Sequence, residues 1–566
     1  MILGAQRLRF ESLASLLEEH RNWAVAALCL LWVVPGLLGR DIWKPEEAHI
    51  FGTVYSMLIS GDWLVPGLAG ETFLRHPPFY HWTASLAGRL LSPPLALPDA
   101  VRLVNVAYLG GTLWFTGMTV SRLQGSGRGW LGPLVLLGCV GLVQPSHQLV
   151  PENALLLAHA LTAYGLAATA AATAPAALCV GCGIGIAFLS RGISSAFPLV
   201  AVIALVPLML PAFRSRGFMR FVILAAVVSL PWLLLWPLTL ALHDAALFQE
   251  WWLQQVGRLR IDVADAQGSG SSVLYFLSVL PWFAWPVLPF AAYGVWLSRS
   301  EMRTSVRVTL PLLVFLCTLA VLSLVREKRE IFALPLLVPL SILASSAVPN
   351  LRRGAINAFF WFGIAFFLFL LAAAWFYFVA VEFGIPGKVA RHMAAMEPGY
   401  VPSVPVWAMV LAGTLTIAWL VSLFNIRRAP ERPFVTWAAG ATAFWAVLMA
   451  LMLGWIDNAK SYRGMIAELA RVLPPQRGCV SSFSLGESQR ALLHYHAGLT
   501  TRRVEAGWTA DQCDFLLVAG KRGDNLWGQP WQFIWEGHRA GDDRERFRLY
   551  RQDKAITVKT PRPSPG

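Results

Sequence analysis

The sequence predicts an all-α, multi-pass membrane protein that carries a small α/β domain at its C-terminal end. Three observations lead to this fold class. Only 14% of the 566 residues are charged and 56% are hydrophobic, whereas an ordinary soluble domain carries about 25% charged residues. About thirteen apolar runs approach the roughly 20 residues that cross a bilayer as a helix. Charged residues and short strand-like runs become frequent only after residue 455.

The transmembrane domain is expected to cover 23–455, after an amphipathic cytoplasmic arm at 1–22. A helix is expected for each apolar run, because it pairs all its own backbone groups inside lipid. The expected spans are 23–39, 101–120, 130–147, 152–172, 175–190, 195–212, 219–242, 273–297, 308–325, 331–348, 355–382, 403–424 and 433–455. An odd number of spans puts the two termini on opposite sides of the membrane.

Loop charge predicts which side each terminus occupies. One set of loops carries most of the bases, and Lys and Arg in short loops mark the cytoplasmic side. These bases are Arg122, Arg128, Arg214, Arg216, Arg220, Arg299, Arg303, Arg307, Arg352, Arg353, Arg427, Arg428 and Arg432. The alternate loops, expected outside, are 40–100, 243–272, 326–330 and 383–402. The N-terminus is therefore expected in the cytoplasm. Most of the net charge of +14 belongs to the inner loops, so it does not indicate a nucleic-acid partner.

The region 456–559 is expected to form a small periplasmic α/β domain. Its strand-like runs and one helix-like run lie at 478–483, 487–496, 514–518 and 546–551. Cys479 and Cys513 fall in this region, and an oxidising compartment would allow them to pair. The Pro-containing tail at 560–566 is expected to be disordered.

The stretch 40–82, in the first outer loop, is the most informative part of the chain for function. It places two adjacent carboxylates, a Gly-Asp-Trp turn and a basic residue before a double proline within about forty residues. The motifs W-x-P-[DE]-E and S-G-D-W-x-V-P resemble the first extracytoplasmic loop of the protein O-mannosyltransferase-like glycosyltransferases, which have the GT-C fold. The segments 323–340 and 479–520, including GESQRALLHYHAG, are similar to the lipid A aminoarabinose transferases within that family.

The resemblance implies a GT-C-type glycosyltransferase in the bacterial inner membrane. It implies a sugar donor carried on a polyprenyl phosphate, such as undecaprenyl phosphate. It also implies an envelope acceptor, with lipid A as the leading one, and inversion at the anomeric carbon on the periplasmic side. The sequence has no Rossmann-like alternation of strands and helices, the architecture that binds nucleotide sugars, and this agrees with a lipid-linked donor.

Glu46 and Glu47 are the candidate catalytic residues. Glycosyl transfer needs a base for the proton of the incoming hydroxyl, and a carboxylate near the membrane surface can accept it. The family has an Asp proposed as this base at the first acid of the pair. Here the matching residue is Glu46, which is one methylene longer. A purely structural alternative exists, because two acids after Pro45 also stabilise a helix N-terminus.

Five basic side chains are candidate ligands for the donor phosphate, since cations bind phosphate strongly. They are Arg75, His76, Arg191, Arg326 and Lys328. The first two precede the double proline, where the family has an acid and a phosphate-binding Lys, and the third matches a Lys in the family's Lys-Gly-Pro. The last two lie in a short basic outer loop, and charge beside the membrane is costly unless it has a function. Interfacial anchoring and local ion pairs are the structural alternatives.

Asp62, Glu152 and Asn153 are further candidate site residues. Asp62 lies in a turn whose shape it is expected to fix. Glu152 and Asn153 open a span near where the family has an acid, and a helix cap would also explain them. Arg102 begins the second span and is expected to extend to the interface. A divalent metal ion stays an open cofactor, because a lone His does not define a metal site.

Three other functions remain alternatives. A protein O-glycosyltransferase would share the same outer-loop motifs. A flippase or transporter of lipid-linked sugars would be expected to carry broken helices and charges at the membrane midplane, whereas the ionisable residues here gather near the outer surface. A non-catalytic scaffold would need neither Glu46 nor the basic outer loop.

Overall fold

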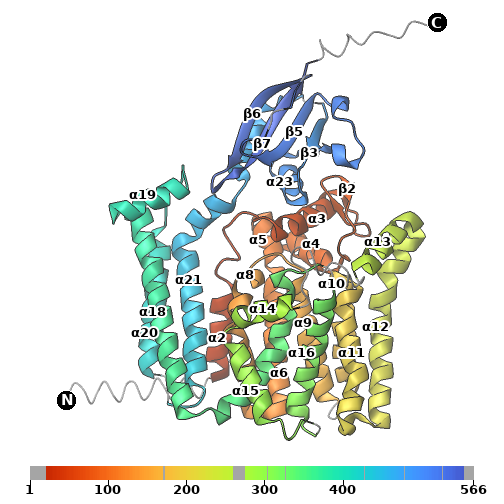
Figure 1. Cartoon of the computed structure of the whole chain (residues 1–566), viewed down its shortest axis with the longest axis vertical. Coiled ribbons are helices and arrows are strands. Elements are labelled where there is room, and N and C mark those ends of the chain that lie inside the picture. The colour runs from red at the N-terminus through yellow and green to blue at the C-terminus, as the bar shows by residue number, and fades with distance from the viewer. Residues whose placement is uncertain are drawn as a thin grey trace.

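The chain forms a bundle of helices with a β-sheet domain above one end of the bundle (Figure 1). The computed structural model describes residues 21–169, 173–258, 274–302, 304–325, 327–425, 428–476, 478–524, 527–528 and 530–553. Most of the expected N-terminal arm and all of the expected tail at 560–566 lie outside the described residues.

The helices of the bundle differ widely in length, from 6 residues in α5 to 31 in α18. The first part contains α2 (Arg21–Val33), α3 (Glu46–Ser60), α4 (Phe79–Leu91), α5 (Leu97–Arg102), α6 (Val104–Gln124), α7 (Leu131–Leu137), α8 (Val140–Ser146), α9 (Glu152–Ala168), α10 (Thr173–Arg191) and α11 (Ile193–Met209). The second part contains α12 (Arg216–His243), α13 (Ala245–Arg258), α14 (Tyr275–Phe283), α15 (Val287–Leu297), α16 (Val306–Leu324), α17 (Leu337–Ala347), α18 (Arg353–Phe383), α19 (Gly387–Met396), α20 (Val406–Asn425), α21 (Arg432–Lys460) and α22 (Arg463–Val472). The hairpin β1 (Gly67–Leu68) and β2 (Glu71–Thr72), and the 3₁₀ helices at Ser126–Arg128, Pro211–Phe213, Glu330–Leu336 and Val348–Asn350, complete the list.

Each of the thirteen expected spans overlaps a helix or a bent helix pair. Among the described residues, seven helices are long and apolar enough to cross a membrane, or up to nine if each bent pair is one span. The pairs bend by 75° between α7 and α8 and by 104° between α14 and α15. The fold class of a helical membrane protein is therefore confirmed, while the count of thirteen crossings stays a prediction.

Burial separates the central helices from those expected to face lipid. In the segment Glu330–Asn350, 89% of the most apolar stretch is buried inside the protein. The corresponding share is 28% for α18 and 17% for α20. Large apolar side chains stay exposed on these outer helices, among them Phe369 and Phe424. Exposed apolar surface of this extent is the mark of a membrane contact. The helices α18, α20 and α21 lie together at one edge of the bundle, and α11, α12 and α13 lie at the other (Figure 1).

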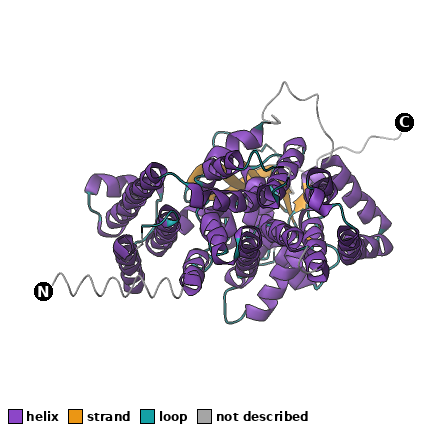
Figure 2. Cartoon of the chain, turned by 90° about the horizontal axis from the view of Figure 1, so that it is seen from below, coloured by secondary structure: helices purple, strands orange, loops and turns teal. Residues whose placement is uncertain are grey.

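The domain above the bundle is a five-stranded mixed sheet. Its strands are β3 (Val480–Phe483), β4 (Arg502–Arg503), β5 (Phe515–Lys521), β6 (Trp531–Arg539) and β7 (Asp542–Gln552), in the spatial order β4-β3-β5-β7-β6. β3 runs parallel to β4 and β5, and β7 runs antiparallel to β5 and β6. The apolar run FLLVA makes β5 the buried central strand. Viewed from below, the sheet lies behind the ends of the helices (Figure 2).

The sheet domain packs on the first outer loop through two helices. Helix α23 (Glu487–Ala497) lies against α3, and their apolar side chains belong to one hydrophobic core. The two backbones approach closely at Gly52, where an added Cβ would lie 2.4 Å from the Cβ of Ala491. Only a glycine permits this separation. The candidate site residues that flank α3 therefore lie between the bundle and the sheet domain.

Replacing Gly52 with alanine should weaken the contact between α3 and α23. The added methyl group overlaps Ala491, and overpacking of a well-packed contact costs about 1–3 kcal/mol. We expect a lower thermal unfolding midpoint and faster proteolytic release of the sheet domain from the purified protein. Gly110→Ala is the matched control, because Gly110 lies on α6 with no neighbouring atom within 4 Å of an added Cβ. Equal behaviour of the two variants would contradict the packing argument.

Candidate active site at the outer end of the bundle

The two adjacent acids at the start of α3 point in different directions. Successive residues on an α-helix are rotated by about 100°, so Glu46 and Glu47 cannot share a face. The side chain of Glu47 is fully buried, whereas that of Glu46 is 21% exposed. Both acids lie in the first turn, where the partial positive charge of the helix N-terminus stabilises carboxylates. Only Glu46 is open to the outer surface.

Glu47 lies between two buried arginines. Arg40 donates two hydrogen bonds to its carboxylate, at 2.5 and 2.9 Å, and Arg102 donates a third at 2.8 Å. Burial by itself raises the pKa of Glu47, but the charges and hydrogen bonds of Arg102 and Arg40 outweigh it and lower the pKa to about 2. Glu47 is therefore ionised at neutral pH and held within the protein.

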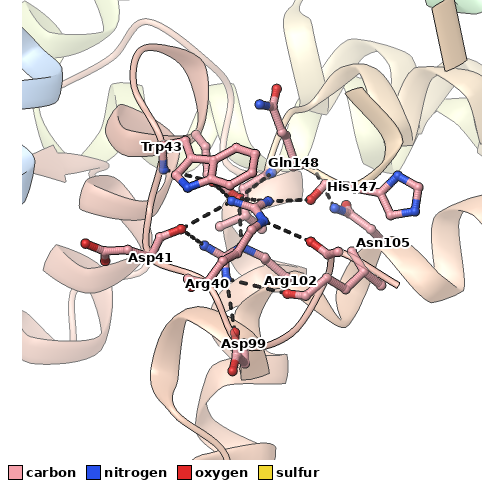
Figure 3. A network of polar contacts seen from close by, with 12 residues as sticks. Arg40, Asp41, Trp43, Asp99, Arg102, Asn105, His147 and Gln148 are labelled. Atoms are coloured by element: carbon pink, nitrogen blue, oxygen red, sulfur yellow. Dashed lines mark hydrogen bonds and ion pairs between the residues drawn. The ribbon is translucent and has the colours of Figure 1, made fainter. Parts of the chain in front are cut away.

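The same two arginines join three separate segments of the chain (Figure 3). Arg40 also donates to the backbone carbonyl of His147 at 2.7 Å. Arg102 donates to the carbonyl of Asp41 at 2.6 Å and forms an ion pair with Asp99 at 3.1 Å. Its side chain is fully buried, so the expectation that Arg102 would extend to the interface is wrong. The carboxylate and carbonyls supply the partners that make burial possible.

Glu46 belongs to an alternating row of charges on the outer side. It forms an ion pair with Arg329, which also contacts Glu327 at 3.1 Å. Arg75 bridges Glu327 at 2.9 Å and Glu487 at 3.1 Å. These five residues come from α3, the loop before the 3₁₀ helix Glu330–Leu336, the first outer loop and the sheet domain. All are partly exposed, so they can exchange partners with a charged ligand.

A cavity opens beside this row. Arg191 lines it, paired with Glu152 at 2.9 Å and stacked 4.0 Å from the ring of Phe332. Six of its thirteen lining residues are apolar, and they are Leu155, Pro198, Leu322, Val325, Phe332 and Pro335. Glu327 lines the same cavity and connects it to the outer charges. Gly192, with φ +91°, breaks α10 from α11 directly after Arg191 and so places that arginine at a helix end.

Three of the other expected residues lie in different settings. The carboxylate of Asp62 accepts from the backbone N–H groups of Leu64 and Val65 at 2.9 and 3.0 Å, which shapes a turn. The side-chain amide of Asn153 donates to the backbone carbonyls of Pro145 and Gln148, so it also stabilises the local backbone. Lys328 is half-buried in the outer loop beside Arg329. Arg326 lies outside the described residues.

His76 lies in a row of three imidazole rings. Its ring is stacked on His49 and His81, with centroid separations of 6.1 and 6.5 Å. Burial lowers the pKa of His49 to about 3 and that of His81 to about 4, so both rings are neutral at physiological pH. Among the described residues, no group of three His, Cys, Asp or Glu side chains could hold a metal ion.

Arg40, Arg329, Glu327 and Glu487 are site residues that the sequence did not single out. Arg40 directly precedes the Asp-Ile-Trp-Lys-Pro-Glu-Glu motif, and that adjacency was a usable signal. The other three lie hundreds of residues from Glu46 or Arg75 in the sequence, and no local spacing links them. Their role appears only when the chain is folded.

Comparison with known proteins supports the fold. No protein-family model matches the chain. The undecaprenyl phosphate-alpha-4-amino-4-deoxy-L-arabinose arabinosyl transferase of Serratia proteamaculans is 25% identical over 470 residues, which cover 77% of this chain and 76% of that protein. The crystal structure of ArnT from Cupriavidus metallidurans bound to undecaprenyl phosphate has a TM-score of 0.67 at 17% identity, covering 93% of this chain and 98% of that one.

A more distant structure has the same architecture. The archaeal oligosaccharyltransferase AglB from Archaeoglobus fulgidus has a TM-score of 0.50 at 11% identity, covering 89% of this chain and 70% of that one. The resemblance to GT-C glycosyltransferases and to the aminoarabinose transferases is therefore confirmed. The catalytic and phosphate-binding assignments of single residues stay predictions.

Replacing Glu47 with glutamine should destabilise the protein strongly. It leaves two buried arginine charges without their carboxylate, and breaking such a pair costs about 3–5 kcal/mol. We expect a large fall in the thermal unfolding midpoint, whereas Glu46→Gln, at a partly exposed position, should have little effect on it. A similar midpoint for both variants would contradict the structural assignment of Glu47.

Acid should remove the same stabilisation. The pKa of Glu47 falls from 4.5 to about 2 in the folded protein, so its contribution is complete above pH 4.5 and decreases as the pH falls toward 2. A pH titration of unfolding should therefore show less acid sensitivity in Glu47→Gln than in the wild type. Parallel pH curves would contradict this.

Proposed function

We propose that the chain is an inverting glycosyltransferase that moves a sugar from a polyprenyl-phosphate donor to an envelope glycolipid, with lipid A as acceptor. One observation carries the proposal: a cavity lined by Arg191 and by six apolar side chains shares Glu327 with the charged row that contains Glu46. A polyprenyl-phosphate sugar has the same division into apolar chain and anionic head. The names of the curated relatives support undecaprenyl phosphate as the carrier. The proposal that the transferred sugar is a pentose rests on those names alone.

The donor would lie with its isoprenoid chain against the apolar wall and its phosphate at the cavity mouth. Arg191 lines the cavity, and its guanidinium can hold two phosphate oxygens at once. Arg75 and Lys328 lie on the outer side and are the other proposed phosphate ligands. In this arrangement the side-chain cations hold the phosphate.

Glu46 would act as the base once Arg329 has changed partner. In the structure Arg329 forms an ion pair with Glu46, so it occupies the carboxylate that would accept the proton. A donor phosphate beside Glu327 attracts Arg329, because a phosphate is a stronger partner than one carboxylate. The released carboxylate of Glu46 then accepts the acceptor proton. The acceptor oxygen attacks the anomeric carbon from the face opposite the leaving group, the bond from that carbon to the phosphate oxygen breaks, and polyprenyl phosphate departs with the electron pair.

The proposed topology has thirteen crossings in the inner membrane, with the N-terminus inside and the sheet domain in the periplasm. The disulfide between Cys479 and Cys513 supports this orientation, because disulfides persist in the periplasm and are rare in the cytosol. The basic loops at the opposite end of the bundle support it by the positive-inside rule.

Glu46→Gln should abolish transfer without loss of the fold. Loss of a positioned base lowers the rate by about 10²–10⁴-fold. We expect no sugar-sized mass increase on lipid A from cells that carry this variant, as measured by mass spectrometry, while wild type produces it. Glu468→Gln is the matched control, since Glu468 is an exposed acid on α22 outside the site. If Glu46→Gln transfers sugar to lipid A as well as the wild type does, Glu46 is not the base. If the wild type itself adds no sugar to lipid A, lipid A is not the acceptor.

Thiol labelling should test the topology. We expect a membrane-impermeant maleimide to label Cys479 of a Cys513→Ala variant in intact spheroplasts. The wild type should react there only after reduction, because its two cysteines are joined. Labelling of the variant only after lysis would place the sheet domain inside the cell.

A further inference from the structure

A hollow with a volume of about 650 Å³ lies between the sheet domain and the first outer loop. Ser484 follows β3, and Ala519, Gly520, Lys521 and Arg522 close β5, so the hollow lies at the carboxyl ends of two parallel strands. The connection after β3 leads to β4 at one edge of the sheet, and the connection after the neighbouring strand β5 leads to β6 at the other edge. Open α/β sheets bind ligands outside the carboxyl ends of strands at such a switch point.

The opposite wall of the hollow comes from the first outer loop and from β7. Lys44 supplies the loop side, and Asp542, Arg544 and Glu545 supply the strand side. Lys44 lies two residues before Glu46. A ligand in this hollow would therefore be held next to the N-terminus of α3, beside the proposed base but outside the donor cavity.

The acids in this hollow already have partners. Glu545 accepts hydrogen bonds from Lys44 at 2.6 Å, from Gln489 at 2.7 Å and from Tyr462 at 2.5 Å. These contacts lower the pKa of Glu545 against the opposing effect of burial. Asp542 accepts from the backbone N–H of Arg544 at 3.1 Å and lies 3.4 Å from the guanidinium of Arg539.

Two bases in the hollow lack such partners. The side chains of Lys521 and Arg544 are exposed, and no described residue forms an ion pair or hydrogen bond with the ammonium group of Lys521 or the guanidinium of Arg544. Arg522, in contrast, already forms an ion pair with Asp543 at 2.7 Å. The hollow therefore offers two uncompensated cations to an anion, together with carboxylate and backbone oxygens that can accept from hydroxyl groups.

We propose that this hollow binds the phosphorylated sugar headgroup of the acceptor, with Lys521 and Arg544 as ligands of a phosphate monoester. Its volume falls in the range of about 300–1,000 Å³ typical of small-molecule sites. Guanidinium and ammonium groups are the side chains that bind phosphate. The identity of the headgroup as the acceptor rests on the proposed transferase function, but binding of the phosphate to these residues does not.

Direct binding to the purified full-length protein tests the site. The probes are a glucosamine disaccharide that carries a phosphate monoester, the same disaccharide without phosphate, and inorganic phosphate. We expect wild type to prefer the phosphorylated disaccharide to each of the other two by about tenfold or more. The double variant Lys521→Ala/Arg544→Ala should lose about tenfold of that affinity. The variant Lys521→Arg/Arg544→Lys should recover most of it.

Arg551→Ala is the matched control, because Arg551 is an exposed base at the far end of the same strand as Arg544. It should bind like wild type. Unchanged affinity in the double alanine variant, or no preference for the phosphorylated disaccharide over the plain one, overturns the site. Equal affinity for inorganic phosphate overturns the assignment to a sugar headgroup.

The outcome separates this site from the transferase itself. Glu46→Gln should retain full binding of the phosphorylated disaccharide, since Glu46 does not line the hollow. Binding without any transfer by wild type would mean that the proposed function fails while the site stands. Transfer by wild type, with equal binding and equal transfer in the double alanine variant, would mean that the site fails while the function stands.

Discussion

The ion pairs of Glu47 with Arg40 and Arg102 are the constraint on which the rest of the site depends. A carboxylate removed from water is tolerated only when opposite charges and hydrogen bonds surround it, and these two side chains supply both. The arginines in turn use backbone carbonyls from several segments as partners. The loop before α3 therefore cannot shift without exposing a buried charge. Glu46, which directly precedes Glu47 on α3, is held in place with it.

The sheet domain holds the same loop from the other side. Asp41 lies 3.3 Å from His496, Glu71 pairs with Arg490 at 3.0 Å and Lys44 pairs with Glu545 at 2.6 Å. Together with the close approach of α3 and α23, these contacts place the first outer loop between the bundle and the domain. Glu487 extends the charged row from the domain itself. The candidate active site is thus built from the membrane bundle, the outer loop and the sheet domain, and none of the three contains it alone.

Sequence reasoning located several of these parts and missed others for identifiable reasons. The double proline after His76 pointed to Arg75, and the match to the family's Lys-Gly-Pro pointed to Arg191. In the structure Arg75 belongs to the charged row and Arg191 lines the neighbouring cavity. Arg102 was expected at the interface because a basic residue at a span end commonly extends there. Its actual partner, Glu47, lies 55 residues earlier. An arginine that neutralises a buried acid and one that anchors a helix look alike in a sequence.

Hydropathy and local motifs were sufficient to establish a helical membrane protein, the outer loop with two adjacent acids and a glycosyltransferase resemblance, because these are properties of consecutive residues. Only the tertiary structure decided which acid faces outward and which is buried. It also decided that Arg329, 283 residues away, neutralises Glu46, and that Glu487, 412 residues away, meets Arg75. Charges separated in this way pair because packed helices and a docked domain bring them together, and no spacing along the chain records that proximity.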